Sequence, residues 1–200
     1  MPPFTMNKVA AVFSIVRSFA SRASKNKKQK RPIVYTDGSC RCQGLPNAQA
    51  GYGVYWRENH PNNRSGPVPG CQCCHRSEIY AVEQAMQTAV DQKYPRVTIR
   101  TDSAFVLHVF ANLPNYKSLM TINCDLYKSI NEIRTKLDVK IEYVKGHSGV
   151  HGNMQADRIA KEGAKRSEDL AANAQVIPSH SGIYGNEEAD RIVKRGEDRA

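Results

Sequence analysis

Apolar residues in the middle of the chain recur with two different periods. Tyr52, Val54 and Trp56 alternate with other residues, which predicts a strand that carries these three side chains on one face. After Ser77 the apolar positions are instead three or four residues apart, which predicts an amphipathic helix. The same reasoning along the chain predicts strands at about 32–37, 50–57, 64–69, 97–101 and 139–144, and helices at about 77–91, 104–110, 121–136 and 153–165.

The order of these elements predicts the fold class. Three strands come first, and the later strands then alternate with helices, which favours an α/β protein with a mixed sheet covered on both faces. The chain has 200 residues, enough for one ordinary domain with tails, and its 40% hydrophobic content permits a substantial core.

The first 31 residues differ in composition from the rest. They hold eight Lys and Arg and no acidic residue, whereas residues 32–200 hold 21 basic and 19 acidic residues, so most of the net charge of +10 lies on this leader. Its interrupted apolar stretch with Arg and Ser is typical of a mitochondrial transit peptide and is too short to span a membrane. The basic run Lys25–Arg31 has three alternative interpretations. It is a nuclear localisation signal, a segment that tethers the protein to nucleic acid, or only a solvated basic tail. We therefore expect a mitochondrial, nuclear or dually located intracellular protein.

Five of the six cysteines form two tight groups. Cys40 and Cys42 make up the first group, and Cys71, Cys73 and Cys74 the second. Without a secretory signal a disulfide framework is not expected. The remaining alternatives are small reduced side chains, a disulfide formed by oxidation, and a structural zinc site, although the Cys-x-Cys spacing differs from the usual zinc pattern.

A segment near the end of the chain is duplicated. Residues 147–166 recur at 180–199, and 12 of the 20 paired positions are identical. Two copies do not make a solenoid. Only the first copy directly follows a predicted strand, so we expect it to occupy the functional site and the second copy, with Asp190, to form a surface helix or tail. Competition of the two copies for one place is the alternative. The predicted organisation is a leader at 1–31, a domain at 32–168 and a tail at 169–200.

Four acidic residues stand close to predicted element ends. Asp37 and Asp102 end strands, Glu78 lies in the first turn of a helix, and Asp157 belongs to a helix after a glycine-rich loop. Each residue taken alone could be a turn residue or a helix-end charge. Together they would repel one another unless cations lay between them, and hard oxygen ligands suit Mg²⁺ or Mn²⁺. Two such ions about 3.5–4 Å apart would stabilise the attacking and leaving oxygens of a phosphodiester.

The settings of these acids resemble the type 1 ribonuclease H family over roughly residues 32–166. The matching segments are Thr36-Asp37-Gly38-Ser39, Ser77-Glu78, Thr101-Asp102-Ser103, Gly146-His147-Ser148-Gly149 and Ala156-Asp157. The resemblance implies a ribonuclease H-like fold, a five-stranded mixed sheet of order 3-2-1-4-5 with helices on both faces. It implies a monomeric endonuclease that hydrolyses the RNA strand of RNA–DNA hybrids with two Mg²⁺ ions, for which Mn²⁺ can substitute, and that leaves 5′-phosphates. It also implies that the four acids hold the metals and that His147 assists proton transfer or product departure.

The expected substrate contacts depart from the family pattern. Gln43 stands where the family usually has Asn, and Cys74 and His75 belong to a run that replaces a family Arg-x-Thr-Asn-Gln-like segment. Asn123 matches a phosphate contact, but the tryptophan-rich basic handle has no counterpart at 112–118. We expect Gln43, Cys74, His75 and Asn123 to bind the substrate. The alternative is a catalytically weak RNA- or hybrid-binding protein whose cysteines are linked to redox chemistry or zinc. Either a disulfide or zinc would block the groove that senses the 2′-hydroxyl of RNA.

Overall fold

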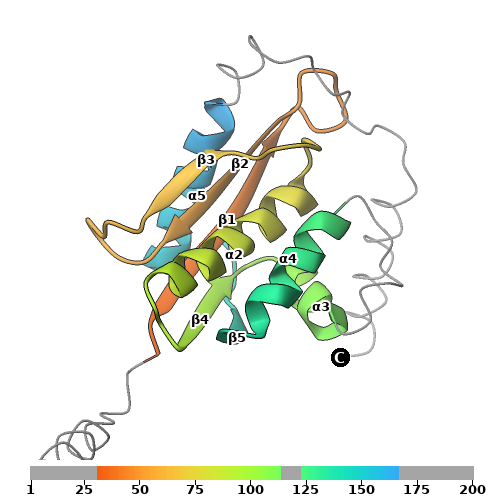
Figure 1. Ribbon diagram of the computed structural model, residues 1–200. Coiled ribbons are helices and arrows are strands. Elements are labelled where there is room, and N and C mark those ends of the chain that lie inside the picture. The colour runs from red at the N-terminus through yellow and green to blue at the C-terminus, as the bar shows by residue number, and fades with distance from the viewer. Residues whose placement is uncertain (1–30, 114–122, 167–200) are drawn as a thin grey trace, which may run out of the picture. The chain divides into compact units, whose positions relative to one another are not determined.

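The computed structural model describes residues 31–113 and 123–166, in which one five-stranded mixed sheet has the order β3-β2-β1-β4-β5 (Figure 1). This confirms the predicted α/β class and strand order. The strands are β1 (Ile33–Arg41), β2 (Gln49–Tyr55), β3 (Arg64–Pro67), β4 (Arg96–Thr101) and β5 (Asp138–Tyr143), and the helices are α2 (Cys74–Asp91), α3 (Ala104–Asn112), α4 (Cys124–Arg134) and α5 (His151–Lys165).

The central strand β1 pairs differently with its two neighbours. It runs antiparallel to β2 as far as Arg41, but it pairs in parallel with β4 only over Ile33–Tyr35. Tyr35 lies opposite Arg100, so the same register continued by two residues brings Asp37 level with Asp102. Asp37 therefore lies inside β1, and the prediction that it ends the strand is wrong, because pairing with β2 extends β1 beyond the end of its ladder with β4.

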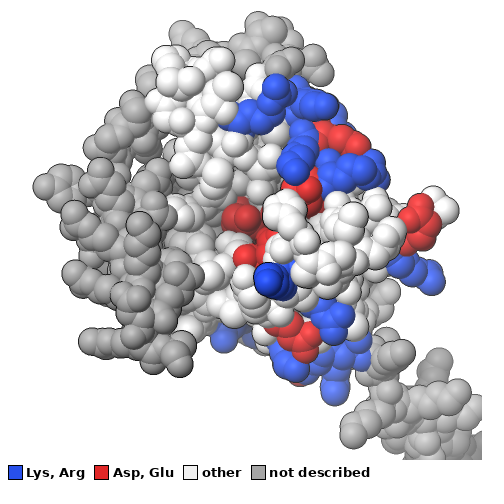
Figure 2. Space-filling model, turned by 180° about the vertical axis from the view of Figure 1, so that it is seen from behind, with Lys and Arg blue, Asp and Glu red and all other residues white. Residues whose placement is uncertain are grey.

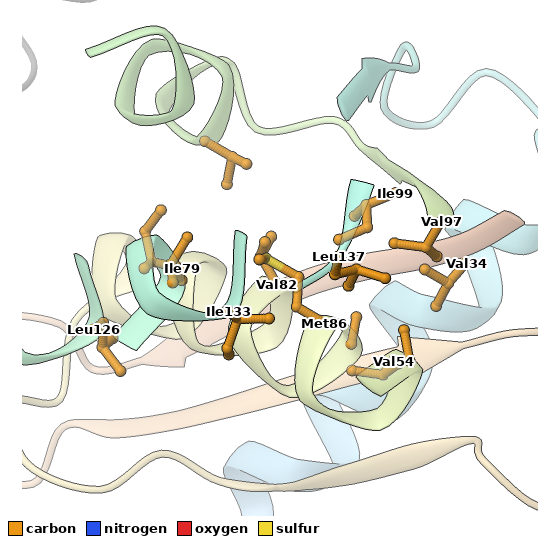
Figure 3. Close-up of a cluster of buried hydrophobic side chains, with 14 of the residues drawn as sticks. Val34, Val54, Ile79, Val82, Met86, Val97, Ile99, Leu126, Ile133 and Leu137 are labelled. Carbon is orange, nitrogen blue, oxygen red and sulfur yellow. The ribbon is translucent and has the colours of Figure 1, made fainter. Parts of the chain in front are cut away.

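Apolar side chains, most of them branched, fill the space between the sheet and the helices α2 and α4 (Figure 3). Val34, Val54 and Ile99 from three neighbouring strands are fully buried there, with Ile79 and Met86 from α2. Burial of each such side chain contributes about 1.5–3 kcal/mol relative to exposure. The core also contains Trp56, and Tyr52 packs against this core. This confirms the prediction that the two side chains lie on the same face of the sheet as Val54.

The opposite face of the sheet is covered by α5, which packs on β1, β2 and β3 (Figure 1). Glycines of β2 permit this contact. A Cβ atom on Gly51 would lie 2.0 Å from the nitrogen of Ala164, and one on Gly53 would lie 2.2 Å from the carbonyl oxygen of Ala156. Backbone thus packs nearly on backbone, which holds α5 close to β1 and β2.

Two helices begin earlier than predicted. Cys73 is extended and its carbonyl accepts a hydrogen bond from the Ser77 nitrogen at 3.1 Å, so α2 begins at Cys74 rather than at Ser77. Glu78 therefore lies in the second helical turn, where the helix dipole acts more weakly than we expected. Helix α5 begins at His151 rather than at 153, and its N-cap residue, Val150, makes no side-chain hydrogen bond.

Some sequence predictions fall on residues outside those described. These are the leader, most of 112–118, the first two residues of the helix predicted at 121–136, and the tail with the second copy of the repeat. Within the described residues, no helix combines the length and the hydropathy needed to cross a lipid bilayer.

Candidate active site

Three of the four predicted acids converge from three different elements. One carboxylate oxygen from each of Asp37, Glu78 and Asp102 lies within 4.8 Å of the other two. Asp37 comes from β1, Glu78 from α2, and Asp102 directly follows β4. Gly38 allows the strand and the helix to approach, because a Cβ atom there would lie 2.3 Å from the Glu78 backbone nitrogen. Among the described residues, this is the one cluster of three or more His, Cys, Asp or Glu ligand atoms at that spacing.

The cluster is electrostatically strained without a cation. Burial raises the pKa of Asp37 from 3.8 to about 7, and the nearby Asp102 and Asp157 add to the rise. The backbone N–H of Gly38 donates to Asp37 Oδ1 at 2.8 Å and opposes the rise. Burial also raises the pKa of Glu78 well above its ordinary value, followed in importance by the charges of Asp37 and Asp102. At neutral pH these groups require either protons or a cation between them.

The donor set fits a divalent metal ion. All three groups offer hard carboxylate oxygens, the ligands preferred by Mg²⁺ and Mn²⁺. The Oε2 atom of Glu78 is buried and accepts no hydrogen bond from residues 31–113 or 123–166. Figure 2 shows acidic side chains set among uncharged ones near the middle of one face, with Lys and Arg gathered beside them. Asp37, Glu78 and Asp102 would hold the ion.

Asp157 lies beside this group rather than within it. It contributes to the raised pKa of Asp37, so its charge acts on the cluster. Its Oδ2 atom, however, accepts a hydrogen bond from Lys161 Nζ one turn along α5 at 2.8 Å. The structure thus brings the first copy of the repeat to the acids, with the carboxylate of Asp157 paired to a lysine.

Asp102 has a partner that the sequence analysis did not include among the site residues. Asn153 Nδ2 donates to Asp102 Oδ2 at 2.8 Å, and Asn153 is only 4% exposed. A signal was present, because the pair Gly152-Asn153 recurs as Gly185-Asn186 in the second copy. Asn is common at helix starts, so its place at the start of the helix predicted at 153–165 indicated no contact with Asp102.

His147 lies in the exposed loop between β5 and α5, as predicted. Its backbone is left-handed, with φ of 53°, and Gly149 two residues later has φ of 83°. Gly146 packs against Asp102, because a Cβ atom there would lie 2.8 Å from Asp102 Oδ2. The loop that carries the histidine therefore contacts a residue of the acidic cluster.

The predicted substrate contacts are held by specific interactions. Gln43 Oε1 accepts a hydrogen bond from the Cys74 backbone nitrogen at 2.8 Å, so it satisfies the start of α2 and joins the two cysteine-bearing loops. His75 packs on Phe105 of α3, with ring centroids 4.1 Å apart, and Phe105 was absent from our predicted site.

Asn123 is more enclosed than a surface phosphate contact would suggest. It is 4% exposed, and its Oδ1 accepts a hydrogen bond from Arg76 Nη1 at 3.3 Å. Arg76 also binds Asp125 through two hydrogen bonds, of 2.9 and 2.6 Å. Arg76 thereby ties the start of α4 to α2.

The two cysteine groups meet beside the acids, as predicted. A hydrogen bond with the Cys74 thiol, followed by burial, raises the pKa of Cys40, and a hydrogen bond with Cys71 likewise raises the pKa of Cys73. Cys74 also contributes to the raised pKa of Glu78. In the described part of the chain, the group of three ligand atoms within 4.8 Å of one another is made by the acids and not by the thiols.

Comparison with known proteins agrees with this fold and site. The sequence matches the RNase H family over residues 29–165. Ribonuclease H1 of Mus musculus is 38% identical over 146 residues, which is 68% of this chain and 51% of that protein. Ribonuclease H1 of Homo sapiens is 36% identical with the same coverage. The chain thus belongs to the RNase H family, and it spans about half the length of the curated relatives it matches.

Solved structures give the same result. The protease–reverse transcriptase of prototype foamy virus is 31% identical with a TM-score of 0.55, and the match covers 70% of this chain and 22% of that one. The solution structure of the PFV RNase H domain is 28% identical with a TM-score of 0.51, over 68% of this chain and 94% of that one.

Proposed function

We propose that this chain is a divalent-metal-dependent endoribonuclease that hydrolyses the RNA strand of RNA–DNA hybrids. The observation that carries the proposal is the convergence of Asp37, Glu78 and Asp102 within 4.8 Å on an RNase H fold. A foamy viral protease–reverse transcriptase that is 26% identical, with a TM-score of 0.56, has been solved in complex with an RNA/DNA hybrid. That complex supports the same substrate class for this chain.

The protein groups have separate tasks in this reaction. Bound Mg²⁺ or Mn²⁺ would supply an activated water and neutralise charge on the departing 3′-oxygen. Asp37, Glu78 and Asp102 hold the ions, and the Gly38 N–H holds one oxygen of Asp37 in place. Asp157 adds negative charge next to these ligands and is the candidate for a fourth metal ligand that binds more weakly. His147 is exposed on its loop, and an imidazole ring can carry a proton to the departing oxygen.

The loops beside the acids are proposed to recognise the hybrid. Gln43 and Cys74 form one joined surface, and His75 with Phe105 forms an aromatic pair next to it. RNA differs from DNA at such a surface by its 2′-hydroxyl, which both donates and accepts hydrogen bonds. Lys and Arg near the acids (Figure 2) would attract the phosphates. Asn123 is proposed as a phosphate contact at the start of α4.

One further feature supports a location for the protein. The Arg- and Ser-bearing, acid-free leader supports a mitochondrial, nuclear or dual location.

Cleavage of a labelled hybrid tests the proposal. With Mg²⁺ the full chain should cut the RNA strand only, leaving 5′-phosphates. Asp37→Asn should lower the rate by more than about 100-fold, because even the hydrogen-bond partner of a metal ligand is worth about 10–100-fold. Asp157→Asn should lower it by about 10–100-fold, and the matched change Asp190→Asn in the second copy should change it little.

Two outcomes would contradict these assignments. Hybrid binding without any cleavage by the wild-type chain would favour the alternative of a weak binding protein. Loss of activity in Asp190→Asn together with full activity in Asp157→Asn would show that the second copy, not the first, serves the site.

A further inference from the structure

Asn153 is a buried polar residue with only half of its amide satisfied. Its Nδ2 donates to Asp102 Oδ2 at 2.8 Å, while its Oδ1 is buried and has no hydrogen-bond partner among the described residues. The orientation of the amide is determined by chemistry, because an ionised carboxylate only accepts hydrogen bonds and the Nδ2 group must face it. Buried polar side chains without full hydrogen bonding are uncommon, and each one calls for a functional or structural explanation.

The contact leaves Asp102 with one free side. Asn153 occupies the Oδ2 atom from α5, and the Gly146 backbone packs against the same oxygen from the preceding loop. The other carboxylate oxygen of Asp102, Oδ1, takes no part in these two contacts. A carboxylate held in this way needs no reorientation when a cation binds, and such partners of metal ligands raise metal affinity.

The same contact links α5 to the cluster. Asn153 and Asp157 are four residues apart on one helix, so their side chains lie on the same face. Both act on the acids, Asn153 through its hydrogen bond to Asp102 and Asp157 through its effect on the pKa of Asp37. The close packing of α5 on Gly53 makes this arrangement rigid.

We propose that Asn153 is a positioning residue that holds Asp102 ready for the divalent metal and fixes the first turn of α5 against the acidic cluster. The proposal rests on the proposed function, since it assigns Asn153 a task at the metal site of that reaction. It assigns this residue no contact with the substrate. Its effect is exerted through Asp102.

The test measures metal binding without substrate. Mg²⁺ is titrated by calorimetry into the full chain, and the rise in Tm with Mg²⁺ is recorded in parallel, for the wild type, Asn153→Leu and Asn153→Ser. We expect the half-saturating Mg²⁺ concentration to rise by about 10–100-fold in both variants. The Mg²⁺ dependence of hybrid cleavage should shift by the same factor.

A matched control separates positioning from general stability. Asn63 is an asparagine that uses both halves of its amide outside the cluster, accepting from the Trp56 nitrogen and donating to the Arg57 carbonyl, both at 2.8 Å. Asn63→Leu should lower Tm without changing the half-saturating Mg²⁺ concentration. In an Asp102→Asn background, Asn153→Leu should cause no further loss of Mg²⁺ binding, because the two residues act as one unit.

Wild-type Mg²⁺ affinity in Asn153→Leu or Asn153→Ser would overturn the proposal, and so would full additivity with Asp102→Asn. If Asn153→Leu does not fold, the smaller Asn153→Ser decides the question. A wild-type chain that binds Mg²⁺ but cleaves no hybrid would overturn the proposed function and leave the role of Asn153 in metal binding to be judged by calorimetry alone.

Discussion

Two groups of chemically reactive side chains meet at one end of the sheet, and they are organised in different ways. The carboxylates of Asp37, Glu78 and Asp102 converge three together. The thiols instead interact chiefly by hydrogen bonds, of Cys40 with Cys74 and of Cys73 with Cys71, and Cys71, Cys73 and Cys74 all contribute to the raised pKa of Cys40.

Charge explains the difference between the two groups. Ionised carboxylates only accept hydrogen bonds, so three of them held close together repel one another and require a cation or protons. Protonated thiols are neutral and can donate, as Cys40 does to the Gln72 carbonyl at 3.4 Å. The oxygen cluster is therefore incomplete without an ion, whereas the sulfur cluster needs none. Proximity of potential ligands alone does not make a metal site.

The largest expected effect comes from neutralising a member of the oxygen cluster. Glu78→Gln keeps the shape of the buried side chain but removes its charge, so the protein without metal should become more stable. With saturating Mg²⁺ the variant should gain far less stability than the wild type, because a ligand is missing. Thermal denaturation in EDTA and in Mg²⁺ measures both effects.

The control for this pair of measurements is Glu83→Gln on the same helix. Glu83 accepts a hydrogen bond from Ser129 and lies outside the cluster. The Glu83→Gln substitution should change the thermal stability of the protein by the same amount with and without Mg²⁺. A Glu78→Gln protein that is destabilised to the same extent in both conditions would show that the cluster is not a metal site.

A second, intermediate effect is the pH dependence of stability. Asp37 has a pKa of about 7 in the folded protein and 3.8 as its ordinary value, so the folded state binds this proton more tightly than the unfolded state. Without metal, stability should therefore fall as pH rises from about 4 to about 7, by at most about 1.4 kcal/mol per pH unit for one proton. Mg²⁺ competes with the proton, so stabilisation by Mg²⁺ should grow over the same range.

Denaturant unfolding at a series of pH values, with EDTA or with Mg²⁺, checks this slope. Asp37→Asn should flatten the curve recorded in EDTA. A rising stability across pH 4–7 in EDTA for the wild type would contradict the prediction, since it would mean that the folded state releases protons instead.

The smallest expected effect concerns the thiols. Peroxide should convert Cys40 and Cys74 to a disulfide, the two thiols losing two protons and two electrons while peroxide is reduced to water. Because the pKa of Cys40 is raised, little thiolate is present and this oxidation should be slow. We expect a modest loss of cleavage activity that a reductant restores.

The Cys40→Ser variant should lose the sensitivity to peroxide. Cys124 is an exposed cysteine on α4, so the control variant Cys124→Ser should remain sensitive. Activity that is indifferent to both peroxide and reductant in the wild type would contradict redox gating and leave the cysteines as small packing residues.

Local pattern was sufficient for much of the fold. Alternation at Tyr52, Val54 and Trp56 correctly predicted the face of β2 that packs in the core. Family motifs then supplied the strand order and the acids, and Asp37, Glu78 and Asp102 do converge. These predictions succeeded because the period of apolar residues and the motif around each acid are properties of short segments.

Element boundaries were less predictable. Serine is common at helix starts, but Ser77 lies inside α2, where its hydroxyl donates to the Cys74 carbonyl at 2.8 Å. Asp37 was placed at a strand end, but pairing with β2 continues past it. A contact with another segment lies at each boundary, since Gln43 accepts from the Cys74 nitrogen at the start of α2 and β2 pairs with β1 beyond Asp37.

The sequence by itself determined which residues can do chemistry and which face of each element is apolar, because both are set by side-chain type and local spacing. Only the tertiary structure decided that Asn153 meets Asp102, that Gln43 meets Cys74 and that the thiols of the two cysteine groups meet. Such contacts join residues that are far apart in the chain. They depend on strand register and on how closely helices pack against glycines, which no single segment of the sequence specifies.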